Sequence, residues 1–290
     1  MHLIHSAPRT FASLLVGALA FTTALGAQGL SYDMSTTATG PDRTGAVATR
    51  NMMAAHGQFA SGNSRIDVTQ SMAQGGMMGQ GTYMITNGSK GTVTSVDPTR
   101  HQYTVIDIGE LGKSAADMQS ALGGIAKIEV ANVKVDVQDL GAGEPLDGYQ
   151  TYKYRITQSY TMNMSVMGRT ISTPTASSTD VWIAPQLDGL MDPSARPPVA
   201  ATAGPMAELT RQLTAAYAKM RKGLMLKRVS TMDSGEGARK RTTTVTTTIT
   251  NVKKSPISPS VFDVPSGYTK VEFGDAMAAQ APAGRHGKPE

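Results

Sequence analysis

Residues 148–185 read GYQTYKYRITQSYTMNMSVMGRTISTPTASSTDVWIAP, and their polarity alternates. The even positions of residues 152–166 are mostly apolar, whereas the odd positions are polar or charged. Because successive side chains of a strand point to opposite faces, this period of two predicts one long strand with an apolar face and a wet face. Residues 167–170 can close a hairpin, after which residues 171–183 run back antiparallel. A strand this long cannot bury its apolar face alone, so the stretch predicts a large, curved antiparallel sheet around it.

The flanking sequence adds further strands and two helices, which together predict a mainly β (α+β) fold. Alternating polarity and turn residues predict strands at residues 30–35, 64–69, 81–86, 91–96, 102–108, 128–137 and 224–231. Residues 46–60 fit a helix or a strand, and a strand is favoured. Apolar residues at helical spacing predict helices at residues 111–122 and 206–220.

The last predicted strand, TTTVTTTITNV at residues 242–252, consists mostly of threonine. Threonine suits a strand because it is β-branched, but this strand has a poor apolar face. We therefore expect it at an edge of the sheet or in a solvent-facing position.

The N-terminal segment has the features of a secretory signal peptide. Histidines and Arg9 precede an apolar run at residues 11–25, and small residues follow at positions 24–27. The alternative, a membrane anchor, is disfavoured because the run is shorter than the roughly 20 residues that span a bilayer. We expect cleavage after Gly26 or Ala27, a soluble periplasmic or otherwise exported protein, a single domain at residues 28–273 and a disordered tail at residues 274–290.

The chain has no cysteine, which excludes disulfides, thiolate metal sites, a cysteine nucleophile and the acylated cysteine of a lipoprotein anchor. The 18 methionines and few aromatic residues predict an adaptable core.

No enzyme motif is found. Gly-x-Ser-x-Gly, Ser-x-x-Lys and phosphate-binding glycine loops do not occur, and three widely separated histidines follow the signal segment. We therefore expect a protein that is not an enzyme, with no catalytic residues, no metal and no cofactor.

Methionine clusters raise the alternative of a Cu(I) site, because thioethers are soft ligands. The two clusters with suitable spacing are Met52-Met53-x-x-His56 and Met162-x-Met164-x-x-Met167. Core packing is the favoured explanation, since Met162 and Met164 fall on the predicted apolar face. The pair Met77 and Met78 lies in a glycine-rich loop and could form an exposed contact surface.

Basic residues gather late in the chain, where residues 211–254 contain 11 Lys or Arg against two acidic residues. This distribution fits a surface for an anionic membrane or an acidic envelope protein, or else a solvated face that keeps the protein in solution. Nucleic acid is disfavoured as a partner because export removes the protein from the compartment that holds it.

Three short segments, GYQTYKYRIT at residues 148–157, VWIAP at residues 181–185 and FDVPSGY at residues 262–268, resemble the periplasmic lipoprotein-carrier superfamily, the LolA and LolB type. The resemblance extends from about Tyr32 to Tyr268 and implies an open half-barrel of about eleven strands. In that fold, helices cover a concave apolar face that can admit acyl chains. The absence of cysteine excludes the lipid-anchored type, the loops around Gln74 and Arg196 are longer, and no binding residue of the carriers can be matched by motif.

Two functions follow from these observations. The first is a carrier or sensor of a lipid or other hydrophobic ligand, bound against Tyr152, Tyr154, Met162, Met164 and Trp182. The alternative is an envelope interaction module with a filled core, which docks its partner through a basic surface that includes Arg221, Lys222, Arg239, Lys240 and Arg241.

Overall fold

The computed structural model describes residues 27–42, 44–72, 78–110, 126–166, 169–188, 205–234 and 241–278. The signal segment at residues 1–26, the predicted helix at residues 111–122, Met77, Met167, Arg239, Lys240, the loops around Gln74 and Arg196 and the end of the tail lie outside these ranges.

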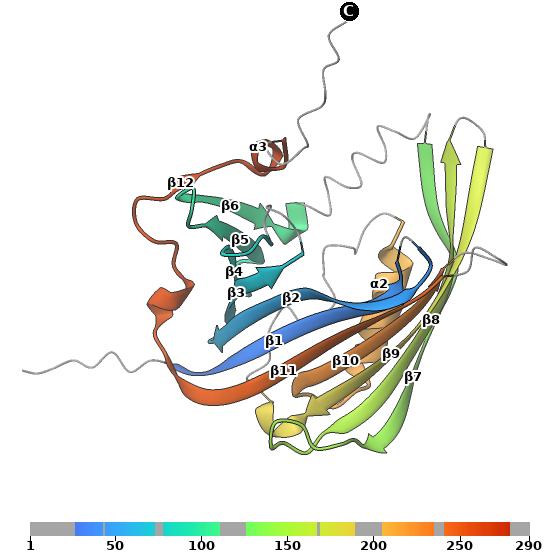
Figure 1. The fold of residues 1–290 in the computed structure, drawn as a ribbon, viewed down its shortest axis with the longest axis horizontal. Helices are drawn as coiled ribbons and strands as arrows, with labels where there is room; N and C mark the ends of the chain where they lie inside the picture. The colour runs from blue at the N-terminus through green and yellow to red at the C-terminus, as the bar shows by residue number, and fades with distance from the viewer. Residues whose placement is uncertain are drawn as a thin grey trace, which may run out of the picture.

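One open, curved sheet of twelve strands contains every described strand, in the order β12-β6-β5-β4-β3-β2-β1-β11-β10-β9-β8-β7 (Figure 1). All neighbouring pairs are antiparallel except β12 with β6. The strands are β1 Ala27–Pro41, β2 Val47–Ala60, β3 Asn63–Ser71, β4 Tyr83–Asn87, β5 Thr92–Asp97, β6 Gln102–Asp107, β7 Ala126–Ala142, β8 Tyr152–Val166, β9 Arg169–Ala184, β10 Leu224–Ser234, β11 Arg241–Ile257 and β12 Thr269–Lys270. The predicted mainly β, half-barrel fold is therefore confirmed, and the stretch at residues 46–60 is a strand.

Strands β8 and β9 form the predicted long hairpin. Their antiparallel register runs without a shift from Val166 opposite Arg169 to Tyr152 opposite Ile183. Strand β7 pairs with the other side of β8 and forms one edge of the sheet. The hairpin therefore lies next to this edge strand, with β10 paired to the other side of β9.

Of the two positions expected for the threonine-rich strand, an edge of the sheet or a solvent-facing place, the edge is wrong. Strand β11 lies between β1 and β10, near the middle of the sheet. Most of its threonines are partly exposed, and some bond laterally, as Thr247 does with Thr36 and Thr244 with Thr231. Hydroxyl pairs across strands therefore replace apolar contacts, which allows a central strand without a strongly apolar face.

Helix α2, Ala207–Ala218, is the predicted second amphipathic helix and packs beside β7. Its apolar side contacts a cluster formed by β8 and β9, whose buried members are Tyr154, Ile156, Val181 and Ile183, together with Met220 after the helix. A second cluster lies at the end of the sheet where β9 ends and β10 begins, and it includes Leu30, Ala184, Leu187, Leu224 and Leu226.

The remaining helices are short. The 3-10 helices η1, Pro185–Leu187, and η5, Pro259–Phe262, follow β9 and β11, and α3, Phe273–Ala278, follows β12. Helix α3 corrects the start of the expected disordered tail, because ordered structure extends to Ala278. Strand β1 begins at Ala27, opposite Ile257, directly after the expected cleavage position. None of the helices in the described ranges is long and apolar enough to cross a membrane.

Candidate functional site

The apolar face of β8 consists of a covered half and an uncovered half. In the covered half, Tyr154 and Ile156 are each 3% exposed and pack with Leu213 and Tyr217 of α2. The Tyr154 hydroxyl accepts a 3.4 Å hydrogen bond from the Arg221 backbone N–H, and the Arg221 guanidinium lies 3.8 Å from the centre of the Tyr152 ring. Both tyrosines are therefore engaged with protein groups at this end of the strand.

The uncovered half begins beyond Ile156. Met164 stands directly opposite Ile128 of β7 and Ile171 of β9, and the three side chains are 41%, 42% and 62% exposed. The next row, Val130, Met162 and Thr173, lies on the same face and is partly exposed. The expectation that Met162 and Met164 serve as core residues is therefore wrong for Met164 and only partly right for Met162.

Within the part of the chain that the structure describes, α2 is too short to cover the whole of this face. Strand β8 has 15 residues and α2 has 12. A strand rises about 3.4 Å per residue and an α-helix 1.5 Å, so β8 spans roughly 50 Å and α2 roughly 18 Å. Even lying fully along the strand, this helix covers less than half of the apolar stripe.

Trp182 does not belong to this face. It stands opposite Lys153, whereas Tyr154 stands opposite Val181, and directly opposite residues share a face. The Trp182 ring is buried between two ammonium groups, with Lys153 Nζ at 4.5 Å and Lys227 Nζ at 4.8 Å from its centre. The predicted grouping of Trp182 with Tyr152, Tyr154, Met162 and Met164 is thus wrong.

An ion-pair network surrounds that tryptophan. Asp180 accepts hydrogen bonds from Arg155 Nε at 2.7 Å on Oδ1 and from Nη2 at 2.9 Å on Oδ2. Lys153 Nζ also lies 2.9 Å from Oδ2. The hydrogen bonds from Arg155, followed by those from Lys153, lower the pKa of Asp180 to about 2. The network of Asp180, Lys153 and Arg155 stabilises the folded hairpin, since each charged group has a partner of opposite charge.

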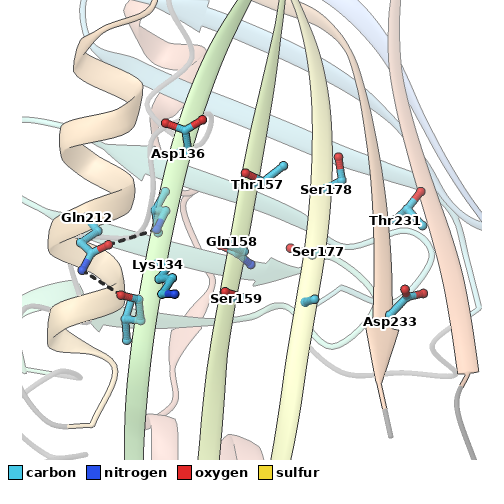
Figure 2. A pocket seen from close by; sticks show the side chains of 13 residues that line it. Lys134, Asp136, Thr157, Gln158, Ser159, Ser177, Ser178, Gln212, Thr231 and Asp233 are labelled. Atoms are coloured by element: carbon cyan, nitrogen blue, oxygen red, sulfur yellow. Dashed lines mark hydrogen bonds between the residues drawn. The ribbon is translucent and has the colours of Figure 1, made fainter. Parts of the chain in front are cut away.

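An open trough of about 740 Å³ lies over β7, β8, β9 and β10 (Figure 2). Most of its side chains are on the face opposite Tyr154: they are Lys134, Asp136, Thr157, Ser159, Ser178, Thr231 and Asp233. These are the wet positions of the alternating pattern, so the sequence indicated their polarity but not the hollow. The lining combines hydroxyl, amide and charged groups with apolar side chains, namely Val133, Val135 and Ala176.

Gln212 of α2 closes part of the β7 edge beside this trough. The backbone N–H of Val135 donates to Gln212 Oε1 at 3.1 Å, and Gln212 Nε2 donates to the carbonyl of Val133 at 3.4 Å (Figure 2). The side-chain amide thus takes the place of a neighbouring strand at these two residues. A bulge between Ala131 and Lys134, where Asn132 has φ 57°, further interrupts the edge.

The described members of the predicted basic surface, Arg221, Lys222 and Arg241, do not form one patch, while Arg239 and Lys240 lie outside the described residues. Arg221 and Lys222 precede the start of β10, whereas Arg241 pairs with Ser234 at its end. The 11 residues of β10 separate the two groups by roughly 35 Å. Other basic side chains have acidic partners, as Lys227 has with Glu144 at 2.8 Å and Arg211 with Glu208 at 2.6 Å.

Clusters of the residues that hold zinc or hard cations do not occur in the described ranges, where no group of three or more His, Asp or Glu could hold a metal ion. His56 Nδ1 lies 2.9 Å from Asp33 Oδ1 and is hydrogen-bonded to it. His56 is therefore engaged with Asp33 of β1, which does not favour the alternative grouping of Met52, Met53 and His56.

Compared with known proteins, the sequence matches no protein-family model and no curated protein. Function is therefore inferred from the geometry of the chain's own residues.

Proposed function

We propose that the protein is an exported binding protein that carries or senses a lipid or another hydrophobic ligand. The ligand lies against the uncovered end of the β8 face, and the site consists of Ile128, Val130, Met162, Met164 and Ile171. The observation that carries the proposal is the row of Ile128, Met164 and Ile171, three large apolar side chains that are directly opposite one another and exposed.

An exposed row of this kind favours binding because contiguous apolar surface is costly in water. Burial of apolar area contributes roughly 25 cal/mol per Å², or about 0.8 kcal/mol for each buried methylene group. An acyl chain laid across the row would bury its own methylenes and the exposed parts of the three side chains. Exposed apolar patches on proteins are a common sign of such binding surfaces.

Methionine suits a ligand of variable shape. Its unbranched, polarisable side chain adapts to different contours, and such side chains are frequent on surfaces that accept several partners. The resemblance to the lipoprotein carriers and the signal-like N-terminal segment support the same function. The proposed site differs from the one expected from sequence, since it uses Met162 and Met164 with β7 and β9 neighbours, in place of Tyr152, Tyr154 and Trp182.

Native mass spectrometry of the protein purified without detergent tests the proposal, followed by titration of the delipidated protein with oleate. We expect a copurified hydrophobic molecule or saturable oleate binding. The double variant Met164→Glu, Ile171→Glu should lose this binding, because two carboxylates on the apolar row would have to be desolvated.

A matched control replaces neighbours on the same two strands that face the other way, Ser165→Glu and Ser172→Glu. These residues pair with Thr170 and Asn163 on the polar face, so the control should bind oleate as the wild type does. Absence of both a copurified ligand and oleate binding would contradict the proposal, as would equal loss in the two double variants.

A further inference from the structure

Three methionines surround a second, smaller hollow, far along the sheet from the β8 face. The backbone N–H of Met72 donates to the carbonyl of Met52 at 3.0 Å, one step beyond the last pair of the β2–β3 ladder, Met53 opposite Ser71. Met52 and Met72 are therefore opposite each other, and their side chains leave the sheet on the same face.

A bulge brings the third methionine to the same place. The β1–β2 register passes from Thr36 opposite Met53 to Thr37 opposite Asn51, which leaves Met52 as an extra residue in β2. Regular strands send consecutive side chains to opposite faces, but a bulge redirects them. Met52 and Met53 both line a hollow of about 270 Å³ together with Met72.

The remaining lining of the hollow is neutral. Among the residues that the structure describes, it comprises Asn51, Gln70, Ser71 and Gln80, with no carboxylate, imidazole or ammonium group. Met52 and Met72 are 40% and 52% exposed, so packing in a core does not account for them. The described part of the site thus places three methionines, two of them with exposed side chains, beside neutral polar groups.

Such a donor set selects a particular class of ion. Thioethers are soft ligands that favour Cu(I), whereas carboxylates and carbonyls favour calcium, magnesium and manganese, and zinc prefers thiolate or imidazole. We propose that Met52, Met53 and Met72 form a binding site for a soft monovalent metal ion, Cu(I) or its chemical analogue Ag(I). Met72 takes the place that the sequence pattern gave to His56, which bonds to Asp33 instead.

The flexibility of the side chains makes the site feasible. Each methionine has three rotatable bonds beyond its backbone, so sulfur atoms from two neighbouring strands can converge on one ion without movement of the sheet. The inference does not depend on the proposed hydrophobic ligand, whose site lies on β7, β8 and β9.

The test is a titration of the purified chain with Ag(I), and with Cu(I) under ascorbate against a Cu(I) chelator, read by native mass spectrometry. We expect one ion per chain. The variant Met52→Leu, Met53→Leu, Met72→Leu should weaken binding by at least about tenfold. Loss of a residue that only supports a metal ligand already costs about tenfold or more in affinity, and this variant removes the ligands themselves. The matched control Met162→Leu, Met164→Leu, Met232→Leu removes as many thioethers elsewhere and should bind with unchanged affinity.

A second measurement keeps the test independent of how well the triple variant folds. In the wild-type protein labelled with ¹³C at the methionine methyl groups, Ag(I) should shift the resonances of Met52, Met53 and Met72, assigned from single Leu substitutions. Absence of one-to-one binding, retention of binding in the triple variant, equal loss in the control, or shifts confined to other methionines would each overturn the proposal.

Discussion

At the scale of single residues, Asp180 is the charged group on which the polar face of the hairpin depends. Its side chain is 14% exposed and bonds to both Arg155 and Lys153. These partners hold the pKa of Asp180 at about 2, below the ordinary aspartate value of 3.8. Because the folded-state pKa is depressed, the stabilisation is complete above about pH 4 and is lost as the pH falls through about 2.

The corresponding variant is Asp180→Asn, which should lower the free energy of unfolding by about 1 to 2 kcal/mol at pH 7, allowing for solvent screening. Urea unfolding at pH 7 and between pH 4 and pH 2 measures the effect, and the difference from wild type should shrink across the acid range. Asp136→Asn, which alters an exposed carboxylate on the same face, should change stability by less than about 0.5 kcal/mol. A constant difference at all pH values would contradict the assignment.

Gly57 shows a second residue-scale constraint, set by close packing. It lies on β2 opposite Tyr32 of β1, and a Cβ at this position would overlap the Tyr32 ring, which is 2% exposed. Gly57→Ala should therefore cost about 1 to 3 kcal/mol, the usual range for overpacking. Thermal and urea unfolding measure it, with Gly274→Ala as the control, because nothing lies within 4 Å of a Cβ there. Equal stabilities of the two variants would show that Tyr32 moves aside freely.

At the scale of elements, Gln212 links α2 to the open edge of β7. Replacement by alanine would leave the Val135 N–H and the Val133 carbonyl without this partner. We expect a loss of about 1 kcal/mol and a tendency of the exposed edge to pair with other chains. Analytical ultracentrifugation over a range of concentrations should detect association of Gln212→Ala but not of Gln138→Ala, an exposed glutamine of β7. Monomeric behaviour of both variants would mean that the bulge alone protects the edge.

The same elements show what the sequence could predict. The alternation at Tyr152, Tyr154 and Ile156 was sufficient to predict β8, because the alternation of side chains between two faces depends only on the backbone of the strand itself. The face occupied by Trp182 was not predictable, since it depends on register: Lys153 pairs with Trp182, and a turn one residue longer or shorter would have reversed the face. Likewise, the pattern assigned Met164 to the apolar face, but the extent of cover by α2 depends on tertiary packing.

The methionine hollow marks another limit of the sequence pattern. Met52 and Met53 were recognisable as candidate ligands, but Met72 lies on the next strand and joins them only through the β2–β3 pairing. The bulge at Met52 depends on how β1 and β2 pair, and no spacing rule in the sequence predicts it.

At the scale of the whole molecule, the sheet is longer than the helix that covers it, and this mismatch should produce a gradient of local stability along β8. The part around Tyr154 and Ile156 is buried beneath α2, whereas the end of the hairpin at Met164 and Ile171 projects beyond the helix (Figure 1). Amides in residues 160–166 should exchange with deuterium roughly tenfold or more faster than those in residues 152–158, equal to about 1.4 kcal/mol in opening free energy.

Hydrogen–deuterium exchange read by mass spectrometry measures this gradient, and repeating it with oleate connects it to function. A ligand that binds the uncovered row should slow exchange in residues 126–131, 160–166 and 169–173 and leave β4, β5 and β6 unchanged. The reason is that binding stabilises the closed state and so suppresses only those local openings that disrupt the ligand site. The Ser165→Glu, Ser172→Glu variant should show the same protection, and the Met164→Glu, Ile171→Glu variant none. Uniform protection along β8 without oleate would contradict the predicted stability gradient. Protection centred on Tyr154 in the presence of oleate would instead indicate that the ligand binds beneath α2.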